Sequence, residues 1–177
     1  MKNIIKFIGI AFVLLTLSVN TFAQAVSASA YAEAYIISPL AINKSVDLAF
    51  GNVAVNTVPG SIILSTAGVR TAGPGGAIPV NNPTGTVTAA EFEVTGTVGQ
   101  LVAVTLPSAD VIVTHTNGTD FMTVNAFNCD PLTGFAIPSG GLQTLKVGAT
   151  LNVGGSQLAG YYKTLIPDYF TVTVVYQ

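Results

Sequence analysis

Residues 86–106, which decide the fold, read TVTAAEFEVTGTVGQLVAVTL. In the middle of this stretch the apolar residues Ala90, Phe92 and Val94 alternate with polar residues. Successive side chains of a β-strand point to opposite faces, so a period of two is typical of a half-buried strand. The pattern therefore predicts a strand whose Ala90, Phe92 and Val94 face the core, while Glu91 and Glu93 face water.

Turn signals divide the rest of the chain into similar segments. Gly99-Gln100 predicts a hairpin that makes residues 91–98 and 101–106 antiparallel neighbours. Asn117-Gly118 predicts a second hairpin, because a type I′ turn needs positive φ angles at both central residues. The remaining alternating segments are residues 26–36, 40–42, 48–55, 61–66, 111–116, 121–127, 142–153 and 169–176. The segments 73–85 and 131–141 are rich in Gly and Pro and are expected to be loops without regular structure.

The spacing of these segments predicts an all-β protein. Val and Thr are abundant, and no amphipathic helix follows residue 23. About nine short strands, with turns every 8–12 residues or so, indicate an antiparallel β-sandwich. Residues 24–177 are long enough for one core, and no linker divides them, so a single domain is expected.

Residues 1–23 have the pattern of a secretory signal peptide. Lys2 and Lys6 precede an apolar run over residues 7–17, and Thr21-Phe22-Ala23 resembles a cleavage site. The apolar run is shorter than the roughly 20 residues that a membrane-spanning helix needs. We therefore expect export to the periplasm, the cell surface or the exterior, with no stable membrane span after cleavage.

The composition argues against catalysis and against nucleic-acid binding. Only 8 % of the residues are charged, the formal net charge is −2, and the chain has one Cys and one His. A nucleic-acid-binding domain would need a basic patch, which is absent. Cys129 has no partner for an internal disulfide and is expected to be a small packed or loop residue, while His115 precedes a turn and is expected to face solvent or to pair with a neighbour. No catalytic, metal or cofactor site is predicted.

The last strand is strongly amphipathic, since Phe170, Val172, Val174 and Tyr176 share one face. An open strand edge is a template for another strand. Near the start of the mature chain, four small apolar residues alternate with polar ones: Val26, Ala28, Ala30 and Ala32. This segment could pair within its own domain, which its small side chains slightly favour, or it could be donated to a neighbour.

Several ordered motifs resemble the bacterial secreted family called domain of unknown function 4402. These are Leu48-Ala49-Phe50-Gly51, Met122-Thr123-Val124-Asn125, residues 145–151, Gly160-x-Tyr162 and residues 170–174. Residues 165–168 look like an insertion relative to that pattern. The same ending, with Gly160 ahead of the last strand and Tyr176 as the penultimate residue, more loosely resembles chaperone–usher pilins and spore-coat-U-like subunits.

The resemblance to pilins implies an immunoglobulin-like sandwich that lacks its final strand. In pilins a periplasmic chaperone, and then the N-terminal extension of the next subunit, fills the resulting groove. On this reading Phe170, Val172, Val174 and Tyr176 line the edge of the groove, with Gly160 ahead of them. Val26, Ala28, Ala30 and Ala32 are the candidate donor residues.

Two functions from different classes remain open. The first is an exported, non-catalytic structural or adhesive surface subunit that assembles with identical or related subunits by β-strand addition. The alternative is a monomeric secreted binding module, for example for glycans, that uses Tyr31, Tyr35 and the long Gly/Pro loops.

Overall fold

The computed structural model describes residues 24–132 and 134–177. The predicted signal peptide, residues 1–23, lies outside the described residues. A compact unit spans Ile36–Gln177, so it begins later than the expected domain boundary at residue 24. Among the residues described, no helix is long and apolar enough to cross a membrane.

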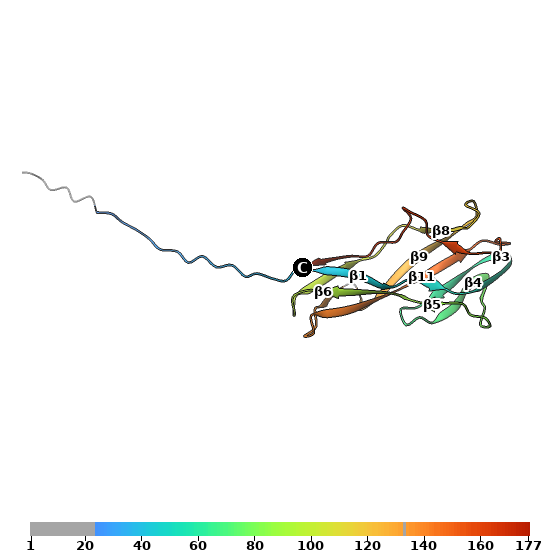
Figure 1. The fold of residues 1–177 in the computed structure, drawn as a ribbon, viewed down its shortest axis with the longest axis horizontal. Helices are drawn as coiled ribbons and strands as arrows, with labels where there is room; N and C mark the ends of the chain where they lie inside the picture. Colours follow the sequence, from blue (N-terminus) through green and yellow to red (C-terminus); the bar gives the residue numbers. More distant parts are fainter. Residues whose placement is uncertain (1–23, 133) are drawn as a thin grey trace, which may run out of the picture. The chain divides into compact units, whose positions relative to one another are not determined.

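The compact unit consists of antiparallel strands in two main sheets, and the described residues contain no helix (Figure 1). The eight-stranded sheet has the order β1-β6-β11-β9-β8-β12, with β3 beside β11 and β4 beside β3. The three-stranded sheet has the order β10-β7-β13, and β2 pairs with β5. The strands are β1 (Ala41–Val46), β2 (Ala49–Phe50), β3 (Val53–Leu64), β4 (Arg70–Pro79), β5 (Val87–Thr88), β6 (Ala90–Thr95), β7 (Leu101–Thr105), β8 (Val111–His115), β9 (Phe121–Asp130), β10 (Gly134–Ala136), β11 (Leu142–Val153), β12 (Tyr162–Lys163) and β13 (Thr173–Tyr176). The predicted all-β sandwich is confirmed.

Strand β11 is the centre of the larger sheet. Its residues 142–147 pair with β6 and its residues 149–153 pair with β3, while β9 occupies the opposite edge. The two neighbours meet at Gly148, where an added Cβ would overlap the carbonyl oxygen of Leu64. A glycine is therefore needed at the point where β11 changes partners.

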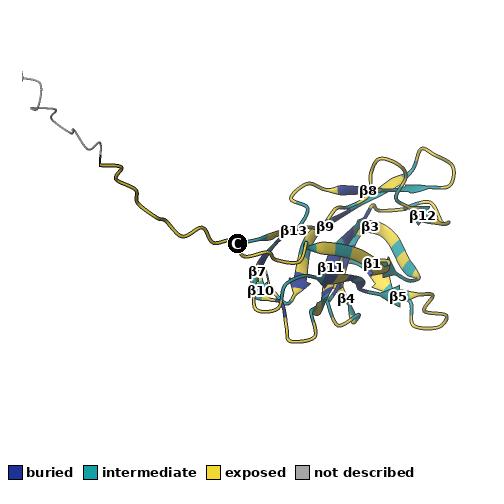
Figure 2. Ribbon diagram, turned by 60° about the vertical axis from the view of Figure 1, so that its left-hand side comes forward, coloured by how far each residue is buried: buried dark blue, intermediate teal, exposed yellow. Residues whose placement is uncertain are grey.

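The core lies between the two sheets and consists of two adjoining clusters of apolar side chains. The first cluster is built mainly from β6, β7 and β11, and the second from β3, β8, β9 and β11. Phe127 and Phe170 pack against both clusters, with their ring centroids 5.2 Å apart. The buried residues are most numerous on β11 (Figure 2), followed by β3 and β6.

Two detailed predictions about this core are confirmed. Ala90, Phe92 and Val94 are buried. Cys129 is also buried, and burial, together with the negative charge of Asp130, raises the pKa of its thiol. A neutral, desolvated thiol is a packing residue and not a reactive one.

The predicted hairpin at Asn117-Gly118 is confirmed, because β8 and β9 pair antiparallel across it. The predicted type I′ turn is wrong, because Gly118 has a positive φ of 81° and Asn117 does not. The predicted hairpin at Gly99-Gln100 is wrong. Strand β6 has β1 and β11 on its two edges, and β7 has β10 and β13, so β6 and β7 lie in different sheets. Both strands contribute side chains to the same core, from two different sheets. Their apolar and polar residues therefore alternate as they would in the two strands of a hairpin.

The two predicted loops contain strands. Strand β4 covers much of residues 73–85, and β10 lies within residues 131–141. In β4 the glycines allow close backbone approach: a Cβ on Gly75 would overlap the Pro59 carbonyl, and one on Gly73 would overlap the Ser61 hydroxyl. Gly and Pro here mark a tightly packed edge strand, which is a known alternative to a loop.

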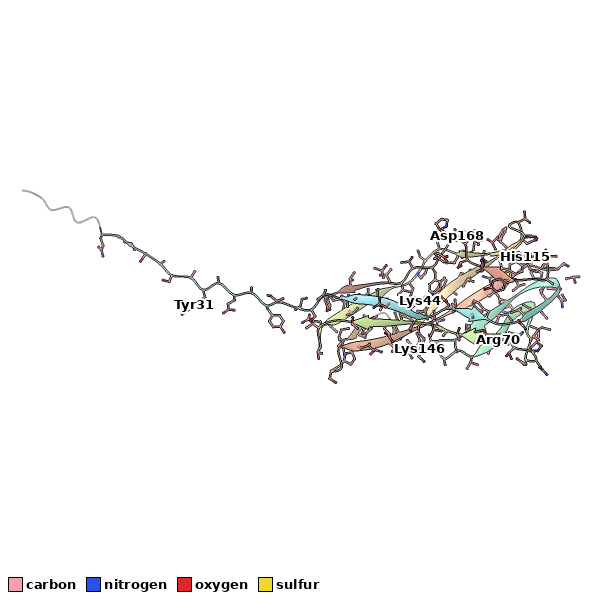
Figure 3. All side chains as sticks on the ribbon, in the orientation of Figure 1. Tyr31, Lys44, Arg70, His115, Lys146 and Asp168 are labelled. Atoms are coloured by element: carbon pink, nitrogen blue, oxygen red, sulfur yellow. The ribbon has the colours of Figure 1, made fainter. Side chains whose placement is uncertain are left out.

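Arg70, at the start of β4, holds three neighbouring segments together (Figure 3). Its guanidinium donates hydrogen bonds to the backbone oxygens of Phe50 at 2.7 Å, Asn52 at 2.8 Å and Val80 at 2.8 Å. The carbonyl of Asn52 also accepts a hydrogen bond from the N–H of Val80 at 3.0 Å, so the side chain adds donors to those of the backbone at this point. Arg70 therefore fixes the junction between β2, β3 and β4.

Candidate functional site: the free edge of strand β13

Strand β13 forms one edge of the smaller sheet. Within residues 24–132 and 134–177 it pairs only with β7, from Thr173↔Thr105 to Tyr176↔Val102. The regular strand is shorter than the predicted segment 169–176, because residues 168–172 are not assigned to a strand. Only the last four residues before Gln177 thus present a regular, open edge.

The four candidate residues at this end of the chain share the core-facing side. Val172 is buried, and Phe170, Val174 and Tyr176 are partly buried against the first core cluster. Ile42 lies in β1, and Leu40 is the residue before that strand. Both are partly buried against the same cluster. Strand β1 is also an edge strand, so core-facing residues beside two strand edges are only partly buried.

The direction of the free backbone groups follows from one hydrogen bond. The N–H of Gln177 donates to the carbonyl of Leu101 at 3.0 Å. Residues of an antiparallel pair alternate between facing the partner and facing away, so Thr173 and Val175 also bond to β7. The N–H and C=O groups of Val174 and Tyr176 therefore point to the open edge, while their side chains face the core.

Tyr176 ties this edge to the beginning of the compact unit, and the C-terminus lies beside the start of β1 (Figure 1). Its hydroxyl donates a hydrogen bond to the carbonyl of Ser38 at 2.9 Å and accepts one from the N–H of Thr97 at 2.7 Å. Gly96 leaves room for this contact, because a Cβ there would overlap the same hydroxyl.

The candidate donor residues lie in a segment without regular structure. Residues 24–40 are assigned to no strand, and Val26, Ala28, Ala30 and Ala32 are exposed (Figure 2). Among the described residues, the predicted strand over residues 26–36 is therefore not formed. Tyr31 and Tyr35 of the same segment are also exposed.

Gly160 lies beside His115. It precedes β12 with a φ of 154°, and a Cβ there would overlap the Nε2 atom of His115. Its local role is to let the chain pass close to the His115 ring, beside β8. His115 itself accepts a hydrogen bond from the N–H of Asn117 at 3.1 Å and packs against Tyr162 with 4.8 Å between ring centroids.

Among the described residues, one ion pair joins two strands. Glu91 forms an ion pair with Lys146, 3.1 Å between Oε1 and Nζ, on the outer face of the larger sheet. Within the same residues, no group of three or more His, Cys, Asp or Glu side chains could hold a metal ion. A shallow open cavity of about 330 Å³ lies where the β7–β8 connection approaches residues 168–171, and Asp110 and Asp168 are its acidic lining residues.

The sequence analysis did not identify the apolar residues on the outer face of the smaller sheet. Val175 and Leu101 point to the outer face of the smaller sheet and are about half exposed, at 51 % and 53 %. The alternation of the final segment could have indicated Val175, because it interrupts the Thr residues of the outward face. Leu101 could not be placed beside it until the pairing of β7 with β13 was known.

Comparison with known proteins gives a match to the family model described as Domain of unknown function (DUF4402), over residues 40–176. No curated protein and no solved structure matches the chain. The matched region begins just before β1 and ends with β13, so it covers nearly the whole compact unit. The chain therefore belongs to the DUF4402 family.

Proposed function

We propose that this protein is an exported, non-catalytic structural or adhesive subunit that assembles with other copies by β-strand addition. The receiving element is the open edge of β13, and the donated segment is residues 24–35. The observation that carries the proposal is the coexistence of an unpaired edge and an exposed, alternating, strand-free segment in one chain.

The backbone geometry of β13 suits an added strand. Its free N–H and C=O groups belong to residues whose side chains face the core, so an added strand would place its opposing side chains in the core as well. Leu40, Ile42, Val174 and Tyr176 are only partly buried and would gain cover. Burial of apolar area contributes about 25 cal/mol per Å², which gives the addition a driving force beyond its hydrogen bonds.

The donated segment is long enough for this role. At roughly 3.3 Å per residue, residues 24–35 extend over about 40 Å, far more than the four residues of β13 require. The segment carries one charged residue, Glu33, and no proline. Such a segment adds readily to an open edge.

The test uses the chain from residue 24 onward together with a synthetic peptide of residues 24–37. Hydrogen exchange is measured at single amides in dilute protein, with and without peptide. We expect the amides of Val174 and Tyr176 to become protected, while those of Thr173 and Val175 change little because they already bond to β7. A matched peptide with proline at both Ala32 and Glu33 lacks ladder donors of either parity within residues 31–35 and should give no protection.

Assembly itself is measured by sedimentation over a range of concentrations. The chain from residue 24 should form larger species as its concentration rises, and added peptide should reverse this by occupying the edge. A chain that stays monomeric and indifferent to the peptide would contradict the proposal. Export and a transient periplasmic chaperone at the same edge are parts of the proposal that cell fractionation and co-purification would examine.

A second candidate function is a secreted binding module. It is favoured by the exposure of Tyr31 and Tyr35, since exposed aromatic rings suit the apolar faces of sugars. Saturable binding on a glycan array, lost in Tyr35→Ala, by a chain that never self-associates would favour this alternative.

A further inference from the structure

The outer face of the smaller sheet carries a small apolar patch, which we call the outer patch: Leu101, Ala103, Ala136 and Val175. These residues are neighbours across three strands, because Ala103 pairs with Val175 and Leu101 pairs with Ala136. Leu101 and Val175 are about half exposed. No charged residue lies on β7, β10 or β13.

The parity of the donated segment decides which of its faces could reach this patch. Tyr31, Glu33 and Tyr35 lie on one face, and the alanines lie on the other. If the tyrosine face entered the core, the Glu33 carboxylate would be buried among the apolar residues of the first cluster. An unpaired charge in such a place is strongly unfavourable. The alanine face must therefore point inward and the tyrosine face outward.

We infer that the tyrosine face of the donated segment covers the outer patch of the receiving copy, so that Tyr31 and Tyr35 determine the affinity of assembly. This inference rests on the proposed function. Adjacent strands are about 4.8 Å apart, and aromatic side chains reach both the opposite residue and its diagonal neighbours. A tyrosine beside β13 therefore contacts Val175 and extends toward Leu101, while the small alanines fit the shallow space above the core.

The receiving copy is a second molecule, and the local sequence gives the reason. Ser38 is held at the end of β13: its N–H donates to the Thr97 hydroxyl at 2.7 Å, and its carbonyl accepts from Tyr176. For a chain to lay residues 31–35 along its own β13, it would have to reverse direction just before Ser38. The two-residue turns that join hairpin strands favour Gly, Asn or Asp at their central positions, and Ile36-Ile37-Ser38-Pro39 contains none of them.

The experiment measures the affinity of labelled peptides of residues 24–37 for the chain from residue 24. The first variant peptide carries Tyr31→Ser and Tyr35→Ser, and the matched control carries Ser27→Ala and Ser29→Ala on the same outward face. We expect the tyrosine-free peptide to bind roughly ten-fold or more weakly, from aromatic–aliphatic cross-strand pairs, while the control peptide binds as the parent does.

A double-mutant cycle locates the contact. The receiving chain carries Val175→Thr, a surface change that should leave its fold and its thermal midpoint nearly unaltered. If a tyrosine packs on Val175, the peptide substitution Tyr35→Ser or Tyr31→Ser loses part of its effect on this variant. Strictly additive effects for both tyrosines would overturn the inference.

The outcomes separate the inference from the proposed function. If both peptides protect the amides of Val174 and Tyr176 with equal affinity, strand addition stands and the role of the tyrosines is wrong. If neither peptide protects these amides, the proposed function fails and the inference fails with it. Weaker binding of the tyrosine-free peptide, with coupling to Val175, supports both.

Discussion

Strands β11 and β13 have the same alternating sequence pattern but opposite positions in the fold. Strand β11 has neighbours on both edges over residues 146–152, and its side chains Leu145, Val147 and Ala149 are completely buried. Strand β13 has a neighbour on one edge, and the core-facing Val174 is only partly buried. Alternation therefore reports which face of a strand is buried, whereas the number of partners decides how completely.

The difference also separates stability from function. In a strand with two neighbours the backbone N–H and C=O groups are hydrogen-bonded on both edges, so none is free to bond to a second molecule. A strand with one free edge stabilises its own domain less and retains hydrogen-bonding groups for a partner. In this chain the centre of the larger sheet holds the domain together, and the last strand is the element that we propose for assembly.

The sharpest test makes the same substitution in both strands. Val147→Ala removes two carbons from a side chain with 0 % exposure, and we expect a loss of about 2–3 kcal/mol in the free energy of unfolding. Val174→Ala should lose less than about 1 kcal/mol, because its site is open and can relax. Urea denaturation of both variants measures the two values.

Added peptide of residues 24–37 should then increase the loss for Val174→Ala and leave that for Val147→Ala unchanged. Equal losses in the free energy of unfolding for Val147→Ala and Val174→Ala, without peptide, would show that Val174 is packed as tightly as the centre of the larger sheet. That outcome would contradict an open edge at β13.

The next largest effect is expected at the anchor of the edge. Tyr176→Phe removes a hydroxyl that donates to the Ser38 carbonyl and accepts from the Thr97 N–H. Because a net hydrogen bond contributes roughly 0.5–1.5 kcal/mol, we expect a loss of about 1–2 kcal/mol with little change in core packing. Thermal unfolding measures it, and Tyr161→Phe, at an exposed site, is the control that should change nothing.

A smaller effect is expected from the ion pair between Lys146 of β11 and Glu91 of β6. Both side chains are partly exposed, so their coupling should be about 0.2–1 kcal/mol and should weaken in high salt. A double-mutant cycle with Glu91→Gln and Lys146→Gln in low and high salt measures it. A coupling well above this range would mean that charge interactions contribute more to the stability of the larger sheet than we expect.

The smallest effect concerns pH. Cys129 lies opposite Val147 in the ladder of β9 and β11, and burial followed by the charge of Asp130 raises the pKa of its thiol above the ordinary value of 9.0. Below that value the thiol is protonated in both the folded and the unfolded chain. Above it the unfolded chain loses the proton first, so the contribution of Cys129 to stability falls as the pH rises toward the folded pKa.

The stability difference between the parent and Cys129→Ala, measured in urea at pH 7 and above pH 9, should therefore shift against the parent at high pH. No shift would mean that the thiol is as solvated in the folded chain as in the unfolded one.

Much of the fold was predictable because it depends on neighbouring residues. The buried face of β6 and the turn at Asn117-Gly118 both follow from side chains close together in sequence. The partner of β6 was not predictable. Residues 91–98 and 101–106 face one core from two sheets, and their pattern of apolar and polar residues is the same as that of two strands in a hairpin. Strand β4 was mistaken for a loop because the close approach that requires Gly73 and Gly75 is made by distant residues.

The candidate site divides in the same way. Phe170, Val172, Val174 and Tyr176 were grouped correctly on one face by their spacing. The hydrogen bond from Tyr176 to Ser38, and the place of Leu101 beside Val175, depend on strand pairing and could not be read from the chain. The separation of residues 24–35 from the compact unit was likewise hidden, because their alternation is as regular as that of true strands.

The sequence by itself determined which side chains each strand buries, because a two-residue period follows from backbone geometry alone. Only the tertiary structure decided which strands are neighbours and which edge stays open. Strand pairing depends on contacts between residues far apart in the chain, and many pairings satisfy the same pattern of apolar and polar faces.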